Sequence, residues 1–171
     1  MIESLTKVVK PADRIQDAIA EPDIVDWVEW EISKLPSVEQ PLTHWFLPGI
    51  YMRQAHTPAG AILTSKKHKT EHFFILAQGV ITVVTDGEKS VLQAPYFGIT
   101  KPGTRRIVYA HTETIFTTIH LNPDDEKDPD KIIERITEPH SNPFFTNKDD
   151  PRINIWKKDI SPSFFATGET P

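Results

Sequence analysis

The stretch FFILAQGVITVVTDG, residues 73–87, decides the fold of this 171-residue chain. It contains two short runs of aromatic and β-branched residues, 73–76 and 80–85, which are separated by Gly79 and followed by Asp86-Gly87. Aromatic and β-branched residues favour strands, and Asp-Gly is a typical turn between two antiparallel strands. The stretch therefore predicts a strand, a break, and a second strand that enters a hairpin.

The same pattern continues on both sides of this stretch. Short apolar runs separated by turn residues recur at intervals of about 8–12 residues, which is typical of a sandwich or barrel. We expect strands at 43–47, 50–56, 61–65, 72–77, 80–86, 89–93, 96–99, 105–110 and 114–121. Because no helical pattern interrupts residues 43–121, the strands should pair in antiparallel fashion.

Helical signals flank the expected strands. Residues 23–35 carry apolar side chains at helical spacing, and Trp27 and Trp30 widen the apolar face. Asp128 followed by Pro129 is typical of a helix start, because the acid caps the helix and proline fits its first position. We therefore expect one helix before the strands and a short one after them.

The two ends of the chain are interpreted as arms. A short helical segment is expected after Pro11, and residues 138–171 contain five prolines and the pairs Phe144-Phe145 and Phe164-Phe165. We expect this last region to be extended and to pack on its own barrel or on a neighbouring subunit. The chain then divides into an N-terminal helical arm (1–35), a β-barrel domain (36–121) and a helix plus extended C-terminal arm (122–171), which form one globular domain overall.

Charge is unevenly distributed along the chain, whose net charge is −5. Residues 1–35 and 122–171 each carry a net charge of −4, and residues 36–121 carry +3. General nucleic-acid binding needs a basic stripe that displaces counterions, so this class of function is excluded. The basic excess of the middle region is expected to attract a small anion or the acidic arms of the chain itself.

Composition also bears on the compartment. The chain has no cysteine, which excludes disulfides and thiol nucleophiles and suits a reducing compartment. No apolar run reaches the roughly 18 residues that a membrane span requires, and residues 1–10 lack the apolar run of a signal peptide. We therefore expect a cytoplasmic protein with no membrane contact.

The densest group of chemically active residues is KKHKTEH, residues 66–72. Imidazole nitrogens and carboxylate oxygens are common ligands of first-row metals. On a strand, His68 and His72 share a face and Glu71 points to the other one, whereas a turn would let Glu71 join them as a ligand or an acid–base group. The alternative is a hydrophilic loop without a ligand role. A helix here would resemble a metalloprotease motif, but the strand-type residues that follow argue against it.

The stretch from His68 to Gly79, the Asp86-Gly87 hairpin and the run KPGTRR (101–106) together resemble the two motifs of the cupin superfamily. In that family the first motif is His-x-His, three residues, Glu, six residues and Gly, and the second is Pro-x-Gly-x-x-His. The resemblance covers about residues 43–121. It implies a mainly β fold: a single antiparallel jelly-roll β-barrel, here with an N-terminal helical arm, a short C-terminal helix and an extended proline-rich tail.

The whole chain also resembles small cupin-like proteins encoded by tailed bacteriophages, with a similar His-Lys-Thr-Glu-His run at residues 68–72 and a Thr-Ile-His at 118–120. That resemblance implies a location in the host cytoplasm or in the virion, and it implies no particular reaction.

Aligned on the two motif glycines, the four ligand positions of the cupin family fall on Lys66, His68, His72 and Arg106. The positive charges of Lys66 and Arg106 would repel a metal ion, which excludes the usual four-ligand site. These two side chains are instead expected to bind a carboxylate or phosphate, because guanidinium matches such anions. At least one of Arg105 and Arg106 is expected to be a surface charge.

The last expected strand offers a replacement ligand. His120 shares one side of residues 114–121 with Phe116, because side chains alternate along a strand. If that side faces inward, His120 meets His68 and His72 as a three-histidine set with open coordination positions, as in catalytic zinc or iron sites. The alternative is a histidine that caps the barrel through hydrogen bonds.

Three functions are consistent with these residues. The first is a cupin-like protein that holds a divalent metal (Fe, Zn, Mn or Ni) through the three histidines, with Glu71 as candidate catalytic group of a small-molecule metalloenzyme. The second is a non-catalytic structural or interaction protein, such as a phage accessory, virion or anti-defence component, whose arms make the contacts. The third is a barrel that binds an anion or small ligand through Lys66 and Arg106. A homo-oligomer, with a dimer as the first expectation, is compatible with all three.

Overall fold

The structure is a computed structural model that describes residues 24–146 and residue 149. The helix expected after Pro11 and the Phe164-Phe165 pair lie outside the described residues. The elements in chain order are α2 (Ile24–Ile32), β1 (Leu42–Leu47), β2 (Gly49–Thr57), β3 (Ile62–Thr64), β4 (His72–Gln78), β5 (Val80–Thr85), β6 (Glu88–Gln93), β7 (Tyr96–Thr100), β8 (Ile107–Ala110), β9 (Thr114–Asn122), α3 (Pro129–Ile136) and α4 (Pro143–Thr146).

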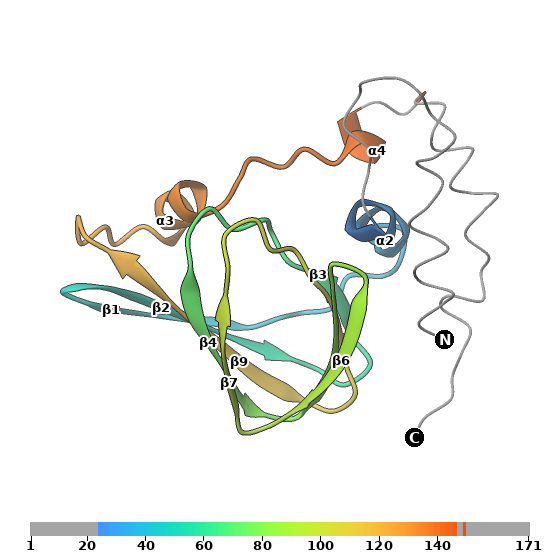
Figure 1. Ribbon diagram of the computed structural model, residues 1–171, viewed down its shortest axis with the longest axis horizontal. Coiled ribbons are helices and arrows are strands. Elements are labelled where there is room, and N and C mark those ends of the chain that lie inside the picture. Colours follow the sequence, from blue (N-terminus) through green and yellow to red (C-terminus); the bar gives the residue numbers. More distant parts are fainter. Residues whose placement is uncertain (1–23, 147–148, 150–171) are drawn as a thin grey trace.

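The strands form two antiparallel sheets that face each other (Figure 1). One sheet has the order β1-β2-β9-β4-β7, and the other has the order β3-β8-β5-β6. Neighbours such as β2 and β9 are far apart in the chain, so each sheet is built from crossing connections, as in a jelly roll. The prediction of a mainly β, antiparallel jelly roll is confirmed, and the expected strands match the observed ones to within a few residues.

The hairpin between β5 and β6 follows the predicted turn. Asp86 and Gly87 both have positive φ angles, 50° and 80°, which is the backbone that a two-residue hairpin with the correct twist requires. Glycine adopts this conformation without a steric penalty, and aspartate tolerates it better than most residues. The turn brings β6 into register with β5, where Val83 pairs with Ser90.

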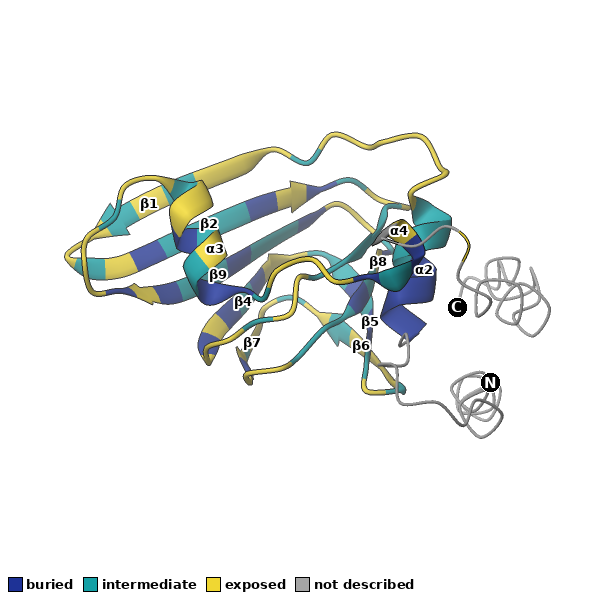
Figure 2. Cartoon of the chain, turned by 90° about the horizontal axis from the view of Figure 1, so that it is seen from above, coloured by how far each residue is buried: buried dark blue, intermediate teal, exposed yellow. Residues whose placement is uncertain are grey.

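Helix α3 covers one end of the five-stranded sheet (Figure 2). It begins as predicted: the Asp128 side chain accepts a hydrogen bond from the Asp130 backbone N–H at 3.0 Å, and proline occupies the first turn. Ile132 and Ile136 are buried against Tyr51 of β2. This helix therefore closes the barrel on the side where the candidate site lies.

Helices α2 and α4 pack against each other beside the barrel, although the strands separate them in sequence. The Trp27 and Phe144 rings meet edge to face with centroids 5.6 Å apart, and Trp30 and Phe145 do so at 5.3 Å. Within the region 138–171 that was expected to be extended, residues 143–146 form a helical turn, and residues 150–171 lie outside the described residues. Trp27 and Trp30 of one arm are therefore ring partners of Phe144 and Phe145 of the other.

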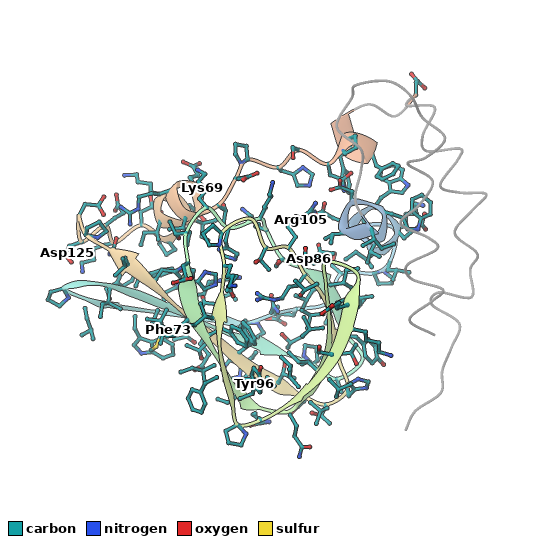
Figure 3. The ribbon with its side chains drawn as sticks, in the orientation of Figure 1. Lys69, Phe73, Asp86, Tyr96, Arg105 and Asp125 are labelled. Carbon is teal, nitrogen blue, oxygen red and sulfur yellow. The ribbon has the colours of Figure 1, made fainter. Side chains whose placement is uncertain are left out.

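Arg105 adds ion pairs to the apolar packing of this helix pair on Val84 and Ile107 of the barrel. Arg105, labelled beside α2 in Figure 3, forms ion pairs with Asp26 at 2.5 Å and with Glu29 at 3.3 Å. Glu29 also accepts a hydrogen bond from Asn142 at 2.8 Å. The basic middle region thus attracts an acidic arm of the chain, one of the two outcomes expected from the charge distribution. None of the described helices is long and apolar enough to span a membrane.

Candidate metal centre

Three histidines converge inside the barrel from two adjacent strands and the loop before them. Phe73 of β4 pairs with Ile119 of β9, so the neighbouring residues His72 and His120 face each other on the inner side of the sheet. His68 lies in the preceding loop, where it makes an isolated β-bridge to Thr137 after α3. The loop is therefore held between the barrel and the closing helix.

One ring nitrogen from each of these residues lies close to those of the other two. One ligand atom from each of His68, His72 and His120 falls within 4.8 Å of those of the other two. The centroid of the His72 ring is 4.2 Å from that of His68 and 4.2 Å from that of His120. This is the three-histidine set expected from strand alternation, and the structure brings its members together.

The environment of the three rings leaves nitrogens that need a partner. His72 and His120 are about 95% buried, and His68 is partly buried. The Nδ1 atoms of His68 and His120 are buried and have no hydrogen-bond partner among the described residues, whereas Nδ1 of His72 lies 3.3 Å from the carbonyl oxygen of Thr70, which accepts its proton. Buried polar atoms are rarely left without a partner, so the two orphaned nitrogens fit a ligand-binding role.

Burial keeps the three imidazoles neutral. Burial lowers the pKa of His120 to about 3, helped by the nearby His72, His68 and Arg53. Burial, followed by His72 and the arginines Arg106 and Arg53, lowers the pKa of His68 to about 4. Burial and Arg106 lower the pKa of His72, while its hydrogen bond to Thr70 opposes the shift. A neutral imidazole carries the lone pair that a metal requires.

The histidines line a cavity of about 320 Å³ that is also lined by positively charged side chains. Arg106 lies inside it, donates a hydrogen bond to the Thr100 hydroxyl at 2.8 Å and sits over the Phe74 ring at 5.3 Å. Burial lowers the pKa of its guanidinium. Arg53 reaches the same cavity from β2, and its Nε is buried with no partner among the described residues.

The other predicted residues differ in whether they reach the cavity. Lys66 lines the cavity although it is an exposed residue. Glu71 is exposed and is not a member of the histidine cluster. Of the two alternatives for Glu71, the structure matches the one in which it does not join the histidines. It corrects the expectation of a surface charge at Arg105 or Arg106, since one is ion-paired and the other lies in the cavity.

Arg53 is the cavity residue that sequence reasoning missed. It belongs to no motif, but it shares the inner face of β2 with Tyr51 and Ala55, which are both buried. Strand alternation applied to β2, as it was applied to the strand of His120, would have placed it inside. Other histidines lie outside the cavity: His111 is partly buried and bonds Thr82 Oγ1 at 2.7 Å, and His44 lies 2.8 Å from the Tyr51 hydroxyl.

Comparisons with known proteins give structural neighbours only. No family model matches the sequence, and no curated protein matches it. The fold is similar to a salicylate 1,2-dioxygenase from Pseudaminobacter salicylatoxidans, with 12% identity and a TM-score of 0.44 over 56% of this chain and 31% of that one. The chain thus spans less than a third of that enzyme's length.

In two other proteins the matched region covers most of the other chain's length. A Cupin 2 conserved barrel domain protein from Salinispora arenicola is 15% identical, with a TM-score of 0.40 over 47% of this chain and 74% of that one. KdgF from Halomonas sp. is 17% identical, with a TM-score of 0.44 over 53% and 87%. One of these neighbours is thus described as a cupin barrel protein.

Proposed function

We propose that this cupin-like barrel is a divalent-metal-binding protein whose ligands are His68, His72 and His120. The observation that supports the proposal is the convergence of three buried, neutral imidazoles within 4.8 Å of one another. The two Nδ1 atoms without partners among the described residues add to it. Three nitrogen donors suit Zn, Fe, Mn or Ni. Such donors generally bind Ni²⁺ and Zn²⁺ more tightly than Fe²⁺ and Mn²⁺.

The ligand count indicates what such a centre does. Three protein ligands leave coordination positions for water or substrate, which is typical of catalytic rather than structural sites. When bound, the ion would supply Lewis-acid or redox chemistry. The chain itself supplies the enclosure: Phe116 and the α3 residues Ile133 and Ile136 line the cavity with apolar surface. We propose a small-molecule metalloenzyme as the activity of this site.

Metal binding should stabilise the folded chain. Adding a ligand at 100 times its dissociation constant stabilises by about 2.7 kcal/mol, which raises the melting temperature of a domain of this size by about 5–10 °C. We expect such a rise when chelator-rinsed, tag-free protein receives Mn²⁺, Fe²⁺, Ni²⁺ or Zn²⁺, and little of it in His120→Ala. Thermal denaturation followed by fluorescence measures both.

The matched control is His111→Ala, which removes a histidine that follows β8, bonds Thr82 of β5 and does not line the cavity. It should keep the metal-dependent rise. An equal rise in the wild type and in His120→Ala would remove His120 from the ligand set.

A second candidate function, anion binding, is favoured by the charges around the cavity. Among the described residues, its lining contains Arg53, Arg106 and Lys66 but no aspartate or glutamate. Partly buried guanidinium groups without a carboxylate partner are suited to a carboxylate or phosphate ligand. Such an anion would also offset the repulsion between the arginines and a metal ion. We propose that the ligand of this cavity carries a negative charge.

Replacing Arg106 by glutamine should weaken anion binding by at least about 10-fold, because a charge-assisted hydrogen bond contributes about 1.5–3 kcal/mol. Glutamine retains a donor for the Thr100 hydroxyl. Thermal shifts with phosphate, benzoate and citrate measure the effect in both proteins. Lys101→Gln, an exposed cation outside the cavity lining, is the control. Identical anion-dependent shifts in wild type and Arg106→Gln would contradict a role for this arginine.

A further inference from the structure

The outer face of the five-stranded sheet carries a continuous apolar row. The antiparallel register places Trp45 of β1 opposite Met52 of β2, Met52 opposite Ile119 of β9, Ile119 opposite Phe73 of β4, and Phe73 opposite Ile99 of β7. One apolar side chain from every strand of the sheet thus lies in a single line. Sheets that face water on one side normally place polar residues there.

Further apolar residues lie on either side of this row. Ile50 of β2 pairs with Leu47 of β1 and with Leu121 of β9, and Ile75 of β4 pairs with Phe97 of β7. We call these residues and the central row the outer apolar face. Its strongly exposed members are Trp45 (40%), Leu47 (63%), Ile50 (38%), Phe73 (60%), Phe97 (69%), Ile99 (51%) and Leu121 (78%). Figure 3 labels Phe73, and Figure 2 shows exposed positions along these strands.

The exposed area of this face matches what a stable dimer buries. The seven exposed fractions amount to about four whole large side chains, or on the order of 800 Å². A standard protein interface buries about 800 Å² on each partner, whereas the largest apolar patch of a typical monomer is about 300–600 Å². The outer apolar face is therefore larger than a monomer normally exposes.

The charge of the face indicates the kind of partner. Aspartate, glutamate, lysine and arginine are absent from the outward positions of β1, β2, β9, β4 and β7, although charged residues make up 25% of the chain. A charge-free apolar surface complements itself, because a two-fold arrangement brings no like charges together. A partner recognised by its charge would require charged residues on this face.

We propose that the outer apolar face is the interface of a two-fold symmetric dimer with a second copy of this chain. The central strand β9 would lie near the symmetry axis, with Ile119 in the middle of the buried row. The proposal does not depend on the metal centre, which lies on the inner side of the same sheet.

Sedimentation of the full chain tests the proposal. We expect a dimer at micromolar concentration, and we expect Phe73→Lys to raise its dissociation constant by at least about 100-fold, because the substitution places a charge in both copies of a buried interface. Val91→Lys is the matched control, since Val91 is 62% exposed on the other sheet. A wild-type monomer, or a dimer that persists in Phe73→Lys, would overturn the proposal.

A second measurement tests the dimer independently if Phe73→Lys does not fold. The chain has no cysteine, so Leu121→Cys on β9 introduces a single thiol on the face. A short bifunctional maleimide should link two copies through it and should not link Val91→Cys. If sedimentation shows a dimer and Leu121→Cys stays uncrosslinked, the dimer uses another surface. If the chain is a monomer and this thiol is shielded from reagent, another segment of the same chain covers the face and the proposal is wrong.

Discussion

Replacing both His68 and His72 by alanine is expected to reduce the bound metal from about one ion per chain to below about 0.1. The two residues supply two of the three imidazoles in the cluster, and a single remaining nitrogen cannot compete with water and buffer for a divalent ion. The loss in affinity should be at least about 1,000-fold, since even the partners that only orient a ligand contribute about 10–100-fold. Mass spectrometry of the metal content in reloaded, desalted, tag-free protein measures it.

The matched control removes two histidines elsewhere. His56 lies on β2 and bonds Gln54, and His111 bonds Thr82 on the other sheet. Neither lines the cavity. The double variant His56→Ala/His111→Ala should therefore keep about one ion per chain. Metal retained by His68→Ala/His72→Ala would refute the proposed centre, and the identity of the metal in the wild type would narrow the chemistry.

Replacing Gly79 by alanine is expected to destabilise the fold by about 3 kcal/mol, a roughly 150-fold shift in the folding equilibrium. Gly79 joins β4 to β5 with a φ of 93°, which side chains rarely adopt. An added Cβ would also collide with the backbone oxygen of Glu113 and with the Thr114 side chain. Neither neighbour can move easily, because Thr114 begins β9. Urea denaturation of both proteins gives the difference in the free energy of unfolding.

Gly60→Ala separates the two contributions to that loss. Gly60 has a similar φ of 82°, but a Cβ there would meet nothing within 4 Å. Its substitution should cost only the left-handed backbone, about 1–2 kcal/mol. The excess in Gly79→Ala then measures the collision with β9. Equal losses at the two positions would mean that the sheet relaxes around the new methyl group.

Strands were predictable because their signals are local. Alternating apolar residues and turn residues such as Asp86-Gly87 act over a few positions, and β5 and β6 follow from them almost to the residue. The same alternation placed His120 on one side of β9 with Phe116, and the structure shows that this side faces inward, opposite His72. Where alternation was not applied, on β2, Arg53 was missed.

Contacts between distant segments were not predictable in this way. Helical spacing indicated α2 and placed Trp27 and Trp30 on its apolar face, but it did not indicate what that face packs against. The contacts of Trp27 with Phe144 and of Trp30 with Phe145 depend on the path that the chain takes after α3. No local pattern encodes that geometry. The position of Glu71 was also left open by the sequence. A shift of one residue moves a side chain to the other face of a strand, so the side that Glu71 faces depends on where β4 begins.

The contact between α2 and α4 has a consequence for biosynthesis. Asp26 and Asn142 are joined by a hydrogen bond across 116 positions of the chain. At about 5–20 residues per second, a ribosome needs about 6–23 s to reach the second partner after making the first. Throughout that interval Trp27 lacks its Phe144 partner, and the nascent chain presents an apolar helix to chaperones. The packing of α2, the first described element, can be completed only after the whole barrel has been translated.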